Sequence, residues 1–132
     1  MRRALVVDGG GVHADTVMGA LAAAGFEALP VPSLAAARPL VEAGALAVVV
    51  GLDVGEGLSA LSLWPPSLRR GCVVAVVGEA DPGGMKAFRM GVDVLLPAAE
   101  AARLGEVLAA AIATKRLLVA PLDGAAAARL GA

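Results

Sequence analysis

Short runs of valine, leucine and alanine alternate along this chain with stretches in which apolar residues recur at helical spacing. Each run is almost unbroken in its apolar character, which is typical of strands that are covered on both faces of a parallel sheet. The alternation therefore predicts a layered α/β domain with helices on both sides of its sheet. The candidate strands are residues 4–8, 27–31, 46–52, 73–78 and 92–96.

The segments between these runs carry signals for the starts and ends of helices. Gly25 follows an apolar stripe and should stop the first helix. Ser33 is a good N-cap for the second, although Pro39 lies inside that helix and should kink or delay it. The predicted helices cover residues 12–24, a segment opening at Ser33, residues 58–63 ended by 64–66, a segment announced by Asp81-Pro82, and residues 98–114.

Five strands and five helices in strict alternation predict a flavodoxin-like (βα)5 fold, a doubly wound parallel sheet with strand order 2-1-3-4-5. This domain is expected to occupy residues 1–115. Residues 116–132 form either a helical extension or a loosely held tail, and the sequence does not say whether the chain is a fragment of a longer protein.

The composition argues against a nucleic-acid partner. Of the 132 residues, 58% are hydrophobic, so the chain can bury a sizeable core, but only 2% are aromatic, which leaves little surface for stacking bases. Lys and Arg number 11 against 12 Asp and Glu, and the basic residues form no stripe that would follow a phosphate backbone.

Membrane insertion and secretion are also not expected. The longest apolar runs end after about eight residues, well short of the roughly 20 that cross a bilayer. Asp8 interrupts the apolar stretch after Arg2-Arg3 too early for a secretion signal. The single cysteine, Cys72, excludes an internal disulfide, so we expect a cytoplasmic protein.

Ligands and catalytic groups of doubly wound sheets collect beyond the carboxyl ends of the strands. The residues predicted there are Asp8 with Gly9 to Gly11, Gly51 to Asp53, Gly78 with Glu79, and Leu96 with Pro97.

Three segments, ALVVDGG, AVVVGLDVGEGL and MKAFRMGVDVLLP, resemble the receiver domain of response regulators, over nearly all of residues 3–115. The resemblance implies transfer of a phosphoryl group from a histidine kinase to an Asp on the third strand. It further implies two acids after strand 1, a Thr or Ser after strand 4 and a Lys after strand 5. Carboxylates would hold Mg²⁺, while the lysine and the hydroxyl would bind the phosphoryl oxygens.

The chain departs from the receiver pattern at most of these positions. Asp8 keeps the first acid, but glycine or leucine stands at the second acid, the phosphoacceptor, the hydroxyl and the lysine positions: Gly9, Gly51, Gly78 and Leu96. The aromatic residue of strand 5 is also missing. We therefore interpret the chain as a pseudo-receiver, a non-enzymatic protein-binding module of bacterial signalling with no cofactor and no bound metal.

Two alternatives stay open from the sequence. Asp53, two residues beyond Gly51, could be a genuine phosphoacceptor, with Asp8 as its metal ligand. Alternatively, Gly9, Gly11 and Ala14 match the G-x-G-x-x-A form of a dinucleotide loop, so the Gly9 to Gly11 turn could bind a nucleotide or another small molecule.

The resemblance also implies a binding face for a protein partner or a second copy, formed by helix 4, strand 5 and helix 5. Its residues would be Lys86, Arg89, Met90, Val94, Arg103 and Glu106. Three further residues are given structural roles. His13 has no other His or Cys to join it in a metal site and should face solvent, and Cys72 should be a buried and inert thiol. Trp64 should fold back onto the domain or, alternatively, anchor a partner.

Overall fold

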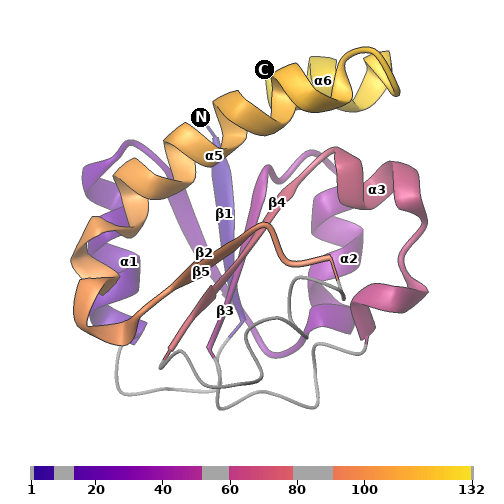
Figure 1. The fold of residues 1–132 in the computed structure, drawn as a ribbon. Helices are drawn as coiled ribbons and strands as arrows, with labels where there is room; N and C mark the ends of the chain where they lie inside the picture. The colour runs from indigo at the N-terminus through magenta and orange to yellow at the C-terminus, as the bar shows by residue number, and fades with distance from the viewer. Residues whose placement is uncertain (1, 8–13, 52–59, 79–90, 132) are drawn as a thin grey trace.

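In the computed structural model, which describes residues 2–7, 14–51, 60–78 and 91–131, five parallel strands form one sheet in the order β2-β1-β3-β4-β5 (Figure 1). The predicted flavodoxin-like topology is therefore confirmed. The strands are β1 (Arg3–Val7), β2 (Glu27–Val31), β3 (Ala47–Gly51), β4 (Val73–Val77) and β5 (Val94–Leu96).

Successive residues of the central strands point to opposite faces of the sheet and pack into two separate cores. In β1, Ala4 and Val6 belong to one core, whereas Leu5 and Val7 belong to the other. The same alternation runs through β3 and β4, where all residues except Gly51 are buried. A strand covered on both faces needs apolar side chains at every position, which explains the unbroken runs in the sequence.

The helices divide between the two faces of the sheet. One core is closed by α1 (Ala14–Ala23) and α5 (Leu104–Val119), and the other by α2 (Leu34–Glu42) and α3 (Pro66–Arg70) (Figure 1). Trp64 is 3% exposed and belongs to the second core, as expected. Helices on both faces make the sheet doubly wound.

The ends of α1 and α2 follow the predicted signals. Gly25 adopts a φ of +87°, and the N–H of Phe26 donates to the carbonyl of Leu21 at 3.0 Å, which closes α1. The hydroxyl of Ser33 accepts from the N–H of Ala36 at 3.1 Å. Pro39 does not delay α2, because the helix begins at the residue after Ser33 and runs to Glu42.

The prediction for the third helix was wrong. Residues 60–63 form a 3₁₀ turn, and the prolines expected to end a helix instead begin α3, with Pro65 at the N-cap and Pro66 at the first helical position. A proline is tolerated there because the first-turn N–H groups have no partner within the helix.

The last predicted helix differs at both ends. Residues 98–103 form a 3₁₀ helix, η2 (Ala98–Arg103), and α5 continues beyond the predicted end at Thr114 to Val119. A further helix, α6 (Gly124–Leu130), folds back on α5 and is capped by Asp123, whose carboxylate accepts from the N–H of Ala126 at 3.1 Å. Residues 116–130 are thus a helical extension and not a loose tail, because Val119 and Leu130 are buried in the first core.

The backbones of α1 and α5 approach closely at Gly105. A Cβ atom at this position would lie 2.5 Å from the carbonyl oxygen of Ala20 and 2.5 Å from the Cβ of Ala24. Glycine is therefore required sterically at the contact between the two helices.

Candidate functional site

The carboxyl edge of the sheet brings three of the predicted site residues together. Gly51 ends β3 and pairs with Val77 of β4, which in turn pairs with Leu96 of β5. The N–H of Gly78 donates to the carbonyl of Leu96 at 3.0 Å. Gly51, Gly78 and Leu96 thus lie on neighbouring strands, as the predicted topology requires.

These three residues offer little chemistry. Gly51 is half-buried, Gly78 is buried, and the side chain of Leu96 belongs to the first core. Neither a glycine nor a leucine can bind a cation, accept a phosphoryl group or donate a hydrogen bond from its side chain. Asp8, Gly9 to Gly11, His13, Asp53 and Glu79 lie outside the described residues.

The part of the chain that the structure describes contains no group of three or more His, Cys, Asp or Glu side chains that could hold a metal ion. None of the helices in the described ranges has the length and hydropathy that a membrane span needs.

The second predicted site, the face of helix 4, strand 5 and helix 5, is described in part. Val94 of β5 is half-buried and packs against the first core. Arg103 and Glu106 are exposed and bound to each other, with 2.9 Å between Nε and Oε1, and Arg103 also pairs with Glu100 at 3.1 Å. The hydrogen bonds to Glu106 and Glu100 raise the pKa of Arg103. Lys86, Arg89 and Met90 lie outside the described residues.

The opposite, amino edge of the sheet holds a polar network that the sequence analysis missed. Nζ of Lys115, on α5, donates to the carbonyl of Arg69 at 2.7 Å, to the carbonyl of Cys72 at 2.6 Å and to the carboxylate of Asp93 at 2.9 Å. All three hydrogens of the ammonium group can therefore be satisfied by protein acceptors. The ammonium ties the end of α3 and the starts of β4 and β5 to α5.

Asp93 is fixed from both its backbone and its side chain. Its N–H donates to the carbonyl of Val74 at 2.8 Å, and Oδ2 accepts from the N–H of Val74 at 2.9 Å as well as from Lys115. The carboxylate of Asp93 thus adds a hydrogen bond to β4 just before the first residue pair of the β4–β5 ladder, Ala75 with Val94. The side chains of Lys115 and Asp93 are only 16% and 26% exposed, so this ion pair is more shielded than the surface pairs.

A shallow cavity of about 250 Å³ lies beside this network, lined by Pro66, Arg69, Arg70, Gly91, Asp93 and Lys115. Within the described ranges, Nε of Arg69 is buried without a hydrogen-bond partner. Arg70 is paired with Asp123 of the C-terminal extension at 3.5 Å. Arg70 thus connects α3 to the segment before α6, and Lys115 connects α5 to the start of β5.

Cys72 is buried at the start of β4, as predicted. Its burial raises the pKa of the thiol to about 12, although the nearby ammonium of Lys115 opposes the shift. Because the thiolate is the reactive form, burial and the raised pKa both disfavour reaction of Cys72 at neutral pH.

One sequence signal could have revealed the amino-edge network. Lys115 continues the apolar stripe of Leu108 and Ile112 on the last helix, at the spacing where another buried side chain would be expected. A charge on a core-facing position needs a partner, and Asp93 at the start of a predicted strand is a candidate.

Comparison with solved structures identifies a receiver-like fold. NtrX from Brucella abortus, a response regulator solved in complex with ADP, superposes with a TM-score of 0.71 and 24% sequence identity. The match covers 89% of this chain but only 28% of NtrX, so the chain corresponds to less than a third of that protein. No family model and no curated protein matches the chain.

Proposed function

We propose that this receiver-like domain is a non-enzymatic, phosphorylation-independent protein-interaction module of bacterial signalling, located in the cytoplasm. The main observation in its favour is the set of residues at the carboxyl ends of β3, β4 and β5. Gly51, Gly78 and Leu96 stand where the family resemblance calls for the phosphoacceptor, the hydroxyl and the lysine.

Phosphoryl transfer depends on fixed charges placed around the transferring group. Without a lysine at position 96 or a hydroxyl at position 78, two contacts to the phosphoryl oxygens are lost. The polar network around Lys115 cannot replace them, because it lies at the starts of β4 and β5, on the opposite edge of the sheet.

The proposal is tested by measuring the intact mass after incubation with acetyl phosphate and Mg²⁺. We expect no stable gain of a phosphoryl group. A stoichiometric gain that disappears in Asp53→Asn would overturn the proposal and establish the alternative, in which Asp53 is the acceptor and Asp8 a metal ligand. In that case beryllofluoride with Mg²⁺ should also perturb the amides around both residues.

A nucleotide-binding role for the Gly9 to Gly11 turn is the other alternative. NtrX was solved with ADP, but the match to this chain covers 28% of NtrX. A thermal-shift series with ADP, ATP and NAD tests this role, and we expect no change in melting temperature.

The face predicted from helix 4, strand 5 and helix 5, of which Val94, Arg103 and Glu106 are described, is the first surface to test for a protein partner or a second copy. Arg103→Glu would place three carboxylates together, because Glu100 and Glu106 flank this position. If copies pair through this face, sedimentation should show a dimer that dissociates in Arg103→Glu, whereas Arg38→Glu, on α2, should leave it intact.

A further inference from the structure

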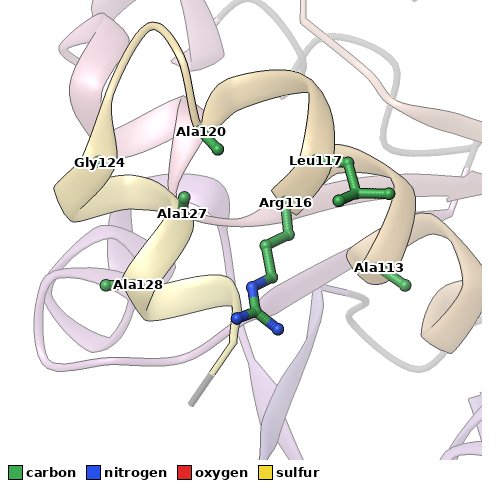
Figure 2. A pocket seen from close by; sticks show the side chains of 7 residues that line it. All are labelled: Ala113, Arg116, Leu117, Ala120, Gly124, Ala127 and Ala128. Atoms are coloured by element: carbon green, nitrogen blue, oxygen red, sulfur yellow. The ribbon is translucent and has the colours of Figure 1, made fainter.

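The hairpin of α5 and α6 contains an open groove of about 720 Å³ (Figure 2). Most of the residues that line it are alanine or glycine, so the backbones of both helices are accessible to a bulky neighbour. Such small residues allow a second helix to approach closely. The lining residues are Ala113, Arg116, Leu117, Ala120, Gly124, Ala127 and Ala128.

Large apolar side chains concentrate on the same hairpin. Leu117, Leu118 and Leu122 are 76%, 68% and 77% exposed. In the described part of the chain only one other large apolar side chain, Leu63, is comparably exposed. Leu117 lines the groove, and Leu118 and Leu122 belong to the same hairpin. Exposed large apolar side chains that cluster in one region are typical of interaction surfaces.

The groove is also positively charged. Arg116 extends between the two helices toward the end of α6, where its guanidinium lies over Gly131 (Figure 2). No ion pair between described residues includes Arg116, and Asp93 and Asp123 are paired with Lys115 and Arg70. An arginine in an apolar groove attracts a ligand that combines aliphatic side chains with a carboxylate.

We propose that this groove binds an amphipathic helix of a partner protein, with leucine-like side chains against the alanines and a carboxylate paired to Arg116. The inference rests on the proposed role as a protein-interaction module, and it places the binding surface on α5 and α6, with none of Val94, Arg103 and Glu106 in its lining. Helix-in-groove binding of this kind is a common mode of protein recognition.

Charge and shape favour this occupant over two others. A second copy that docked through the same hairpin would bring another Arg116, and both acidic residues of the hairpin are already paired, Asp123 with Arg70 and Glu106 with Arg103. A membrane surface would meet a ridge of leucines, but it could not fill a concave groove between two helices.

Fluorescence anisotropy with a synthetic helical peptide tests the proposal. The probe is a labelled peptide of about 20 residues, long enough to be helical on its own, with leucines at i, i+4 and i+7 and glutamates beside them. A second peptide carries lysine in place of every glutamate. We expect saturable binding of the glutamate peptide, at least about tenfold tighter than the lysine peptide, and a reversed preference in Arg116→Glu.

Matched variants separate the groove from general surface effects. Ala128→Trp should fill the groove and abolish binding, whereas Ala125→Trp, exposed on the same helix but outside the lining, should bind like the parent. Arg129→Glu, also on α6 and outside the lining, should weaken binding far less than Arg116→Glu. Circular dichroism of each variant checks that it is folded.

Several results would overturn the inference: no saturable binding of the glutamate peptide, or equal losses in Arg116→Glu and Arg129→Glu. A concentration-dependent dimer that Ala128→Trp dissociates would assign the groove to a second copy. Arg116-dependent cosedimentation with phosphatidylglycerol vesicles, without peptide binding, would assign it to membranes. Each outcome is independent of the acetyl phosphate experiment, so failure of the groove proposal is distinguishable from failure of the proposed function.

Discussion

The described residues at the amino edge and the carboxyl edge of this sheet differ in the charge of their side chains. At the amino edge, Lys115 and Asp93 connect α3, β4, β5 and α5 through charged hydrogen bonds. At the carboxyl edge, where such folds place their chemistry, β3 ends in Gly51, β5 ends in Leu96, and Gly78 follows β4. Among the described residues, charged side chains thus join chain segments at the amino edge, whereas Gly51, Gly78 and Leu96 bring no charge to the carboxyl edge.

The largest expected effect tests whether α6 is packed against the first core. Leu130 is 2% exposed and packs in the first core, so Leu130→Ala should lower the free energy of unfolding by about 3 kcal/mol. Leu122→Ala, at a position 77% exposed, should change it by less than about 0.5 kcal/mol. Urea denaturation measures both, and equal effects would mean that α6 contributes no buried surface.

The next effect tests the network itself. Lys115→Met removes three hydrogen bonds and leaves the carboxylate of Asp93 without its cation. We expect the free energy of unfolding to fall by about 2 kcal/mol. The loss is smaller than for a fully buried ion pair because both side chains are partly exposed. Adding Asp93→Asn should recover part of that loss. Arg38→Met, which breaks the exposed pair with Glu42, should cost less than about 0.5 kcal/mol. If Lys115→Met lowers the free energy of unfolding no more than Arg38→Met does, the amino-edge network contributes no more to stability than an exposed ion pair.

A smaller effect concerns pH. The folded state raises the pKa of Cys72 from 9.0 to about 12, so between these values the unfolded thiol loses its proton while the folded thiol keeps it. Stability contributed by this group is complete below pH 9 and declines as pH rises, by about 1.4 kcal/mol at pH 10 relative to pH 8. The difference in unfolding free energy between the parent and Cys72→Ala should show this slope. A constant difference over that range would contradict the burial of the thiol.

The smallest effect is expected at the carboxyl edge. Gly51 ends β3 and is half-buried, so the carboxylate of Gly51→Asp can reach solvent and should change the free energy of unfolding by less than about 1 kcal/mol. Thermal and urea denaturation measure the change. A loss above about 2 kcal/mol would show that this edge is as tightly constrained as the amino edge.

The fold was predictable because its strongest signals are local. Unbroken apolar runs identified the buried strands, and Ser33 and Gly25 marked helix ends through contacts within a few residues. The start of α3 was missed because a Pro-Pro pair is compatible both with the end of one helix and with the first turn of the next. The continuation of α5 was missed because burial of Val119 depends on α6, which lies further along the chain.

The residues of the amino-edge network were harder to predict, because they lie far apart in the sequence. Lys115 meets Cys72 and Asp93 only after the register of β4 and β5 has placed their starts side by side. Strand order did place Gly51, Gly78 and Leu96 at one edge correctly. The roles predicted for Asp8, Asp53, Lys86, Arg89 and Met90 stay predictions, since these residues lie outside the described ranges.

The contact at Gly105 also constrains how this sequence can vary in evolution. Because a Cβ there would meet both the backbone of Ala20 and the side chain of Ala24, any related chain with the same helix spacing must keep glycine at 105 and a small residue at 24. A larger residue at either position requires the two helices to move apart. This pair of positions is therefore a marker for recognising distant relatives whose site residues have diverged.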